Sequence, residues 1–204
     1  MTSLANRRSA ILLFSLPDCL HSHRTRLVIK EKEISAELHE IDINDISEEI
    51  KSISPYDDFP TLVDRELVLQ NSRVIIEYLD ERFPHPPLLP VDPVARAKFR
   101  LALDRIEHQW YPEFNESYNN GAIDDVFVEK IKSYFLEIVP LISDSYFMSE
   151  DFGLVDCSLA PLLWRIQCLG IEMDKNKEII KRYSDRIFNR ESFQASLSDT
   201  ERDI

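Results

Sequence analysis

The sequence predicts an α/β unit that ends near residue 83, followed by a second half made only of helices. Two observations predict this division. Short apolar or alternating stretches, which are typical of strands, occur before the proline-rich stretch "FPHPPLLPVDP" (83–93), and the pattern beyond it is helical. A length of 204 residues is enough for two compact halves. We expect a domain over 8–84, a linker over 85–93 and a helical domain over 94–199.

The first half is predicted to have the order βαβαββα. Its first strand is an apolar run suited to burial on both faces, and its second strand alternates apolar and polar residues. The last two strands form a hairpin around "DRE". Ser47 is suited to cap the short second helix, and Asn71 or Ser72 the third. In chain order we expect a strand over 9–14, a helix over 21–32, a strand over 36–43, a helix over 47–53, strands over 61–63 and 67–69, and a helix over 71–83.

The second half shows apolar residues at helical spacing. Phe99, Leu103, Ile106 and Trp110 form one stripe of a long first helix, so the aromatic residues there are expected in the core. The segment "LVDCSLAPLLWRIQCLG" is almost wholly apolar and predicts a buried central helix, with Gly170 suited to its end. The tail over 199–204 is expected to be frayed. The predicted helices cover 94–114, 125–140, 154–170, 175–188 and 190–197.

Composition excludes several functional classes. The net charge is −13 and both halves are acidic, so we expect no direct DNA binding by this chain alone. With only three glycines, the chain has neither GxxxxGK[ST] nor GxGxxG. The longest early apolar run, Ala10 to Phe14, is too short for a signal-peptide core or a membrane span. We therefore expect a cytoplasmic, soluble protein with no membrane association.

The cysteines and histidines do not predict a metal site or a disulfide framework. Cys19, Cys157 and Cys168 are odd in number and lack paired spacing. His39 and His108 have no metal-ligand spacing with another histidine, cysteine or acidic residue. We expect no metal and no resident cofactor.

The element order and three motifs resemble the glutathione transferase family, which joins a thioredoxin-like domain to an all-helical domain. The motifs are "DFPTLVD" (58–64), "NSRVIIEYLDERFP" (71–84) and "GLVDCSLAPLL" (153–163), the last similar to a buried capping box. The resemblance implies that Pro60 is cis and that the backbone of Phe59 lies where active members pair with a thiol peptide. Ser72 and Asn71 lie where the peptide's amino end is held, with Asn71 in place of an acidic residue. These four residues are expected to be the remains of a glutathione site.

A narrower resemblance covers nearly the whole chain, from about residue 6 to "SFQASL" near the end. "PTLVDREL", "EYLDERFPHPPL", "PVDPVAR" and "LVDCSLAPLLWR" resemble the stringent starvation protein A family, bacterial proteins that use the glutathione transferase fold to regulate RNA polymerase. The sequence is identified as a member. The resemblance implies a transcription regulator active in starvation or stress, without transferase activity. It also implies binding to RNA polymerase holoenzyme and either a homodimer or a heterodimer with a related chain.

The proline-rich stretch is the predicted partner-binding surface. Pro84, Pro86 and Pro87 lack backbone donors and hold φ near −65°, so the segment should be stiff, extended and exposed. Stiffness lowers the entropy lost when a partner docks. A linker that proline merely rigidifies would need neither His85 nor Leu88 with the leucine that follows it. The family resemblance implies that this Pro-His-Pro loop contacts the holoenzyme through its sigma subunit.

Cys19 supports an alternative function, a glutathione-dependent thiol transferase or reductase. It lies five residues before Arg24, where thiol-type transferases carry their cysteine. It also precedes a predicted helix N-terminus, with His21 and His23 nearby, and this setting favours a thiolate. Against this function, Leu20 follows the thiol where the enzymes usually have proline. A loop cysteine without catalytic function is the simpler interpretation.

A group of cations gives one further hypothesis. Arg96, Lys98 and Arg100 lie in the first two turns of the long helix of an otherwise acidic chain. In the expected dimer this helix lines the cleft between subunits, with Arg73 of the preceding helix close by. Such a cleft could hold a polyanion, and a starvation nucleotide is the natural candidate for a stress regulator. The alternative is that carboxylates of the preceding segments neutralise these cations, namely Glu77, Asp80 and Asp92.

Overall fold

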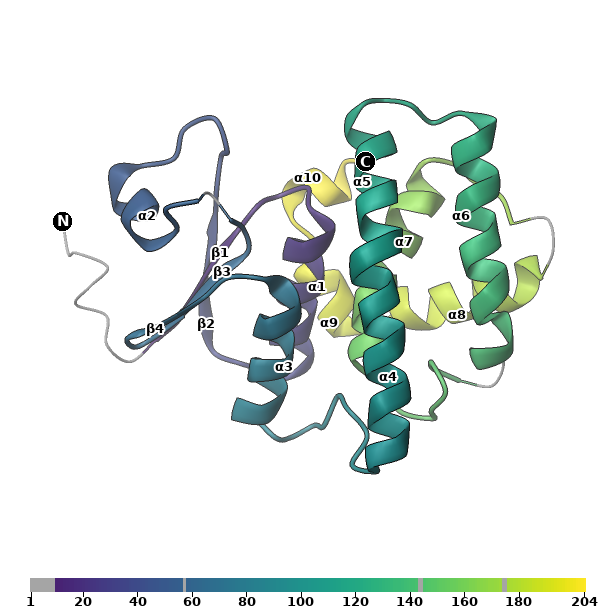
Figure 1. Cartoon of the computed structure of the whole chain (residues 1–204), viewed down its shortest axis with the longest axis horizontal. Coiled ribbons are helices and arrows are strands. Elements are labelled where there is room, and N and C mark those ends of the chain that lie inside the picture. The colour runs from purple at the N-terminus through teal and green to yellow at the C-terminus, as the bar shows by residue number, and fades with distance from the viewer. Residues whose placement is uncertain (1–9, 57, 143–144, 174–175) are drawn as a thin grey trace. The chain divides into compact units, whose positions relative to one another are not determined.

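The computed structural model describes residues 10–56, 58–142, 145–173 and 176–204. The chain forms two compact units. The first unit holds the sheet, and in the described part of the chain the second unit contains only helices and an isolated β-bridge (Figure 1). The second unit runs from Pro87 to Gln194, and the first combines Met1–Pro86 with the C-terminal segment Ala195–Ile204. The predicted helical domain over 94–199 therefore differs from the structure at its end, because residues from 195 onwards pack with the first unit.

The first unit has the predicted order βαβαββα, and a four-stranded mixed sheet lies at its centre. The strand order is β2-β1-β3-β4, with β2 parallel to β1 and both other pairs antiparallel. This is the thioredoxin-like arrangement expected for the fold class. The elements are β1 (Ile11–Ser15), α1 (Leu20–Glu31), β2 (Ala36–Glu40), α2 (Glu48–Ile53), β3 (Thr61–Asp64), β4 (Leu67–Leu69) and α3 (Ser72–Arg82).

Two predicted details of this unit are settled by its hydrogen bonds. The second strand was expected to reach residue 43 but ends at Glu40, because β1 ends at Ser15 and has no further residue to pair with. The amide of Ile41 donates to the carbonyl of Ser15 at 3.0 Å, which is the last contact along that edge. Asn71 caps α3, with its Oδ1 accepting from the amide of Arg73 at 2.9 Å.

The core of the first unit lies on both faces of β1, whose five residues are all buried. On one side, Leu12 and Phe14 pack with Ile41 and Phe59, and the apolar residues of α2 lie against this cluster. Helices α1 and α3 pack together and contribute residues with no exposed surface. The ends of these two helices carry the candidate sites described below.

The second unit is built from helices of mixed type. The predicted helix over 94–114 is interrupted by a π-helical turn that ends two residues before Pro112. Proline lacks an amide donor and clashes with the carbonyl four residues earlier, and a wider turn relieves both effects. None of the helices in the described ranges is long and apolar enough to cross a membrane. The elements are α4 (Pro93–Arg105), η2 (Ile106–Trp110), α5 (Tyr111–Asn119), α6 (Asp125–Ile138), η3 (Val139–Leu141), α7 (Leu154–Cys168), α8 (Lys177–Phe188) and α9 (Glu191–Ser196), which reaches into the C-terminal segment.

Helix α7 is the predicted buried central helix, and a buried carboxylate fixes its start. Asp156 accepts hydrogen bonds from the amide of Gly153 at 2.8 Å, the amide of Phe147 at 2.9 Å and the hydroxyl of Tyr183 at 2.5 Å. Burial raises the pKa of Asp156 to about 6. The helix ends at Cys168, and Gly170, which was predicted to suit its end, follows with a left-handed φ of 68°.

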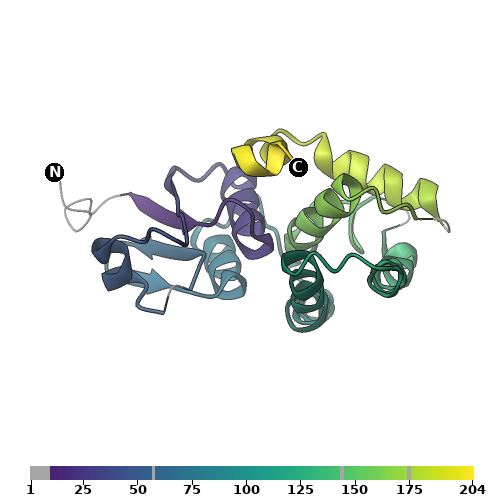
Figure 2. The ribbon, with the colours of Figure 1, turned by 90° about the horizontal axis from the view of Figure 1, so that it is seen from above.

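The C-terminal segment returns to the first unit, so the prediction of a frayed tail was wrong (Figure 2). Its last helix, α10 (Asp199–Arg202), carries Glu201, which is completely buried. The Glu201 carboxylate lies 2.5 Å from the guanidinium of Arg26 and 3.4 Å from the imidazole of His23, both on α1. The hydroxyl of Ser198 donates to the carbonyl of Pro17 at 2.8 Å. A buried cation on α1 thus requires a carboxylate that the C-terminal segment supplies.

Candidate partner-binding loop and candidate thiol site

The proline loop, defined here as Pro84–Pro87, follows directly after α3. All four of its residues are exposed, as the partner-binding hypothesis requires. The peptide bond between His85 and Pro86 is cis. The imidazole of His85 therefore lies between exposed proline rings, on a surface that is partly apolar and partly polar.

A buried lysine anchors the proline loop. Lys32, the residue after α1, has a fully buried side chain. Its Nζ donates to the carboxylate of Asp80 on α3 at 2.7 Å and to the carbonyl of Pro86 at 2.6 Å. One ammonium group therefore joins the loop to α1 and α3 through charge-assisted hydrogen bonds. This restricts where the loop can lie relative to the helices beneath it.

Sequence reasoning missed Lys32, although one signal pointed to its partner. Asp80 lies four residues after Ile76 and next to Leu79, both of which have no exposed surface, so it lies close to the buried face of α3. A carboxylate there needs a buried cation. Nothing in the local pattern "IKEKE" distinguishes Lys32 from an ordinary surface lysine.

The structure corrects the inclusion of Leu88 in the partner-binding surface. Leu88 is only 3% exposed, and its carbonyl accepts from the amide of Leu154 at 2.9 Å. Gly153 makes this close approach possible, because a Cβ at that position would lie 2.9 Å from the Leu88 carbonyl oxygen. The leucine that follows Leu88 is buried as well. The apolar pair after the prolines therefore fixes the start of the second unit and does not extend the exposed loop.

The candidate thiol, Cys19, is a free cysteine directly before α1 and is partly exposed. The basic residues expected to favour its thiolate are directed to other groups. His21 Nδ1 lies 3.0 Å from the hydroxyl of Ser72, and Arg24 donates to the same hydroxyl from Nε at 3.1 Å and from a terminal nitrogen at 2.5 Å. His23 lies against Glu201 of the C-terminal segment. The basic side chains near Cys19 thus have anionic or hydroxyl partners within the fold.

The four residues of the expected glutathione site all lie in the first unit. The Phe59–Pro60 peptide is cis, as the family resemblance implied. Ser72 is 2% exposed and its hydroxyl is held by Arg24, while the side chain of Asn71 caps α3. The polar side chains at this site are therefore used to build the end of α3.

The predicted cation group does not lie within one unit. Arg73 belongs to the first unit and forms an ion pair with Glu77 at 2.6 Å, whereas Glu77 was expected to neutralise the cations of α4. Arg96 donates to the carbonyl of Pro90 at 2.8 Å. Lys98 and Arg100 are exposed on α4 of the second unit. The other two carboxylates have different functions, because Asp80 binds Lys32 and Asp92 caps α4. Nucleotide binding stays a prediction.

Comparison with known proteins identifies both halves of the chain. Residues 13–87 match the family described as "Glutathione S-transferase, N-terminal domain", and residues 105–191 match "Glutathione S-transferase, C-terminal domain". Among solved structures, a glutathione S-transferase from the Antarctic clam Laternula elliptica superimposes with a TM-score of 0.84 at 20% identity, covering 96% of this chain and 95% of the clam chain. At this identity the similarity shows the fold.

Two curated relatives are much closer in sequence. The "Stringent starvation protein A homolog" of Pasteurella multocida (strain Pm70) is 48% identical, with 97% of this chain and 94% of that protein covered. The protein of the same name from Coxiella burnetii (strain RSA 493 / Nine Mile phase I) is 44% identical, with 97% and 96% covered. The similarity therefore spans both units and the C-terminal segment.

Proposed function

The chain belongs to the stringent starvation protein A family, and from this premise we propose that it is a stress-response regulator that binds RNA polymerase holoenzyme. The proposed contact is the proline loop, and its target is the sigma subunit. The observation that carries the proposal is the Lys32 anchor, which holds an exposed loop in place from below. Binding to polymerase would place the protein's action in the cytoplasm.

The chemistry of the loop suits a protein partner. Proline rings offer apolar contact area with little conformational entropy left to lose. His85 adds a flat ring that can both pack and form hydrogen bonds. The chain carries a net charge of −13, so we propose that promoter choice is changed through the polymerase and not through direct contact with DNA.

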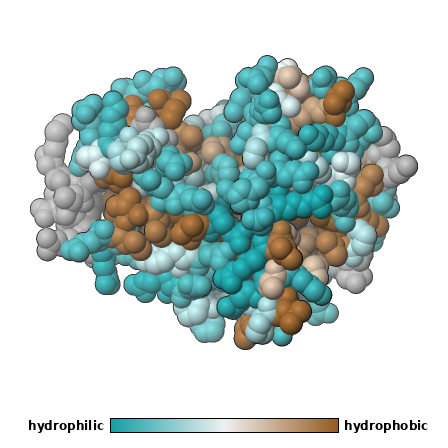
Figure 3. Space-filling model, in the orientation of Figure 1, coloured by the Kyte–Doolittle hydropathy of each residue, from teal (hydrophilic) through white to brown (hydrophobic). Residues whose placement is uncertain are grey.

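We also propose that the protein acts as a dimer, formed across α3 and α4. Both helices, and β4 beside α3, carry exposed apolar side chains, and Figure 3 shows hydrophobic residues on these surfaces. Within each unit, exposed apolar residues that lie near one another are typical of an interface. The dimer could contain two copies of this chain or one copy of a related chain. The exposed residues are Leu67, Val68 and Val74 in the first unit and Val94 and Leu101 in the second.

The proposed regulator has no transferase activity. The support is that the hydroxyl of Ser72 and the basic groups beside Cys19 bind one another within the fold. The purified protein should show no glutathione conjugation and no retention on immobilised glutathione. Robust turnover that disappears in Cys19→Ser would make the thiol enzyme the primary function.

The proposal is tested by capture of RNA polymerase holoenzyme on the immobilised protein. Replacing Pro84, His85 and Pro86 together by alanine should abolish capture, because the change removes most of the exposed contact surface. The matched control is Pro55→Ala with Tyr56→Ala, an exposed proline and aromatic residue in another loop of the same unit. Surface changes of this kind alter stability by about 0.5 kcal/mol or less, so both variants should unfold near the wild-type temperature. Undiminished capture by the loop variant at equal stability would contradict the proposal.

A further inference from the structure

The second unit contains a pocket between α4, the π-helical turn η2, α6 and α7, with a volume of about 260 Å³. Sites for drug-sized ligands have volumes of roughly 300–1,000 Å³, and an apolar cavity of roughly 150 Å³ holds a benzene molecule. The pocket therefore suits a ligand that consists of one ring with a short substituent. Its apolar lining includes Ala102, Ile106, Trp110, Phe147 and Leu159.

One polar group in the wall of this pocket is buried without a hydrogen-bond partner. Trp110 lines the pocket and is only 2% exposed, and its Nε1 makes no hydrogen bond in the part of the chain that the structure describes. The ring stacks on that of Tyr134, with centroids 5.0 Å apart. An indole N–H can only donate, and a buried one usually finds an acceptor. An unpaired donor in the wall of an apolar pocket points to a ligand with an acceptor atom.

The charged groups of the pocket favour a neutral ligand. Its charged lining residues are Arg105 and Glu137, whose side chains form an ion pair at 2.5 Å. The two charges balance, so the lining favours neither an anion nor a cation. Both side chains are about half exposed, so the pair contributes little to stability and can open for a ligand at low cost. Two exposed apolar residues also line the pocket, Leu141 and Leu101, the second of which belongs to the proposed dimer surface.

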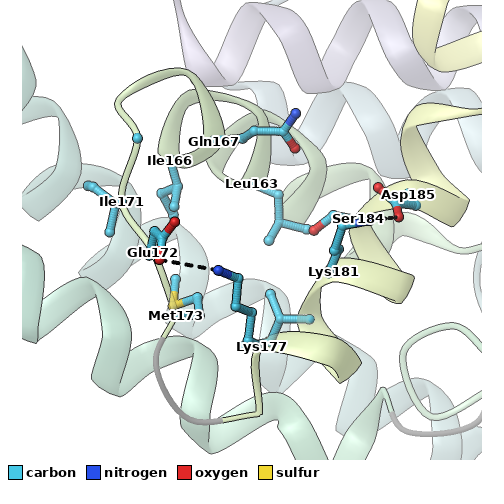
Figure 4. Close-up of a pocket in the computed structure, with 12 residues that line it drawn as sticks. Leu163, Ile166, Gln167, Ile171, Glu172, Met173, Lys177, Lys181, Ser184 and Asp185 are labelled. Carbon is cyan, nitrogen blue, oxygen red and sulfur yellow. Dashed lines mark hydrogen bonds and ion pairs between the residues drawn. The ribbon is translucent and has the colours of Figure 1, made fainter.

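A larger pocket of the same unit lacks this combination. It lies between the end of α7 and α8, with a volume of about 480 Å³ (Figure 4). Its charged side chains pair with one another, Lys177 with Glu172 at 3.2 Å and Lys181 with Asp185 at 2.9 Å. Within the described ranges, no residue of its lining has a buried side-chain nitrogen or oxygen atom without a hydrogen-bond partner. The unpaired donor therefore distinguishes the smaller pocket.

We propose that the pocket at Trp110 binds a small neutral molecule, an apolar ring that carries one acceptor oxygen. The ring would contact Ile106, Phe147 and Leu159, and the oxygen would accept a hydrogen bond from the indole Nε1 of Trp110. The π-helical turn supplies both Ile106 and Trp110, and such turns are frequent at functional sites. The proposal does not depend on polymerase binding.

Acetophenone, a ring with one ketone oxygen, tests the proposal when it is titrated into the purified full-length protein and followed by NMR. The chain has two tryptophans, so two indole N–H signals are expected, and Trp110→Phe assigns them. Saturable 1:1 binding should move the signal of Trp110 to higher frequency. The internal control is Trp164, which packs on Phe188 and Phe193 and does not line the pocket. Its signal should not move.

Isopropenylbenzene, which has the shape of acetophenone with a methylene group in place of the oxygen, tests the hydrogen bond. It should bind about three- to tenfold more weakly than acetophenone, as expected for one hydrogen bond between neutral groups. Trp110→Phe keeps an aromatic ring but has no donor. In this variant, calorimetry should give the two compounds equal affinities.

Ala102→Leu should fill the pocket and abolish binding of both compounds. Its matched control is Ala97→Leu, an exposed position of the same helix, which should leave the affinity unchanged. If Ala102→Leu does not fold, the Trp110→Phe comparison decides alone. The proposal is overturned if acetophenone shows no saturable binding, if it moves the signal of Trp164 as much as that of Trp110, if isopropenylbenzene binds the wild type equally well, or if folded Ala102→Leu binds like the wild type.

Discussion

Helix α1 carries a buried cation near each end, and the two cations support different kinds of surface. Near its start, Arg24 and the neighbouring His21 turn to the hydroxyl of Ser72. Just past its end, Lys32 binds Asp80 and the carbonyl of Pro86. The first arrangement draws polar side chains inward, at the place where active transferases bind a thiol peptide. The second uses one ammonium to support an exposed loop.

This difference suggests how a binding surface can replace a catalytic site within one fold. A thiol site needs polar groups directed at the ligand, and here those groups complete the start of α3. A docking loop needs a fixed backbone and exposed side chains. The Lys32 anchor fixes the backbone of the proline loop and leaves its side chains exposed. The predictions below run from the largest expected effect to the smallest, and those on Lys32 and Ser72 test this comparison.

Lys32→Met should give the largest loss. It leaves the carboxylate of Asp80 buried without its cation, which typically costs about 3–5 kcal/mol of stability. It also releases the proline loop, so capture of RNA polymerase should weaken. Denaturant unfolding and capture on the immobilised protein measure the two effects.

A second variant separates loop anchoring from stability. Lys32→Met combined with Asp80→Leu replaces the ion pair by apolar groups, a change that is often neutral or stabilising. The double variant should regain stability and still capture polymerase weakly, because the carbonyl of Pro86 has lost its donor. Full recovery of capture in the double variant would show that the loop needs no anchor.

The buried carboxylate of Asp156 accepts hydrogen bonds only from neutral donors. Its titration predicts that the stability of the protein depends on pH. Its pKa is raised from 3.8 to about 6. The folded state therefore binds the proton more tightly than the unfolded state does. Its contribution to stability is fully present below about pH 3.8 and is lost as the pH rises through about 6, a change of about 3 kcal/mol.

Urea unfolding of the wild type and of Asp156→Asn between about pH 3.5 and about pH 7 isolates this effect, because the range includes both the ordinary and the shifted pKa. The stability of the wild type relative to the variant should decline as the pH rises, because asparagine does not titrate. A difference that stays constant with pH would show that Asp156 keeps an ordinary pKa.

Among the single substitutions, Ser72→Ala should give the smallest effect. Arg24 loses its acceptor and His21 loses its hydroxyl partner, which should cost about 1–3 kcal/mol of stability. Capture of polymerase should not change, because the proline loop has a separate anchor. The control is Cys19→Ser, which should alter stability by about 0.5 kcal/mol or less. Loss of capture in Ser72→Ala, at a temperature where the variant is fully folded, would show that the start of α1 and the proline loop do not act independently. That result would contradict the comparison.

The sequence was sufficient for features that depend on local periodicity. The order of strands and helices, the buried α7 and the cap at Asn71 could all be predicted, because each depends on residues within about one or two turns of each other. The motif resemblance supplied the fold class and located the exposed prolines.

The features that the sequence did not reveal depend on distant partners. Lys32 meets Asp80 across 48 positions, and Arg26 meets Glu201 across 175. The residues next to Lys32 or Glu201 in the sequence do not indicate that either side chain is buried in an ion pair. Leu88 was assigned to the wrong surface for a related reason, since its burial depends on the missing side chain of Gly153.

The return of the C-terminal segment to the first unit has a consequence for the order in which the protein can be completed. A ribosome makes the whole second unit between the sheet and Glu201. The carboxylate that neutralises buried Arg26 is therefore added only after the second unit, and the nascent first unit lacks it while those helices are synthesised. A fragment cut after Pro86 would have the same defect permanently. The first unit is thus translated before the second unit, but its core can be completed only after the second unit has been synthesised.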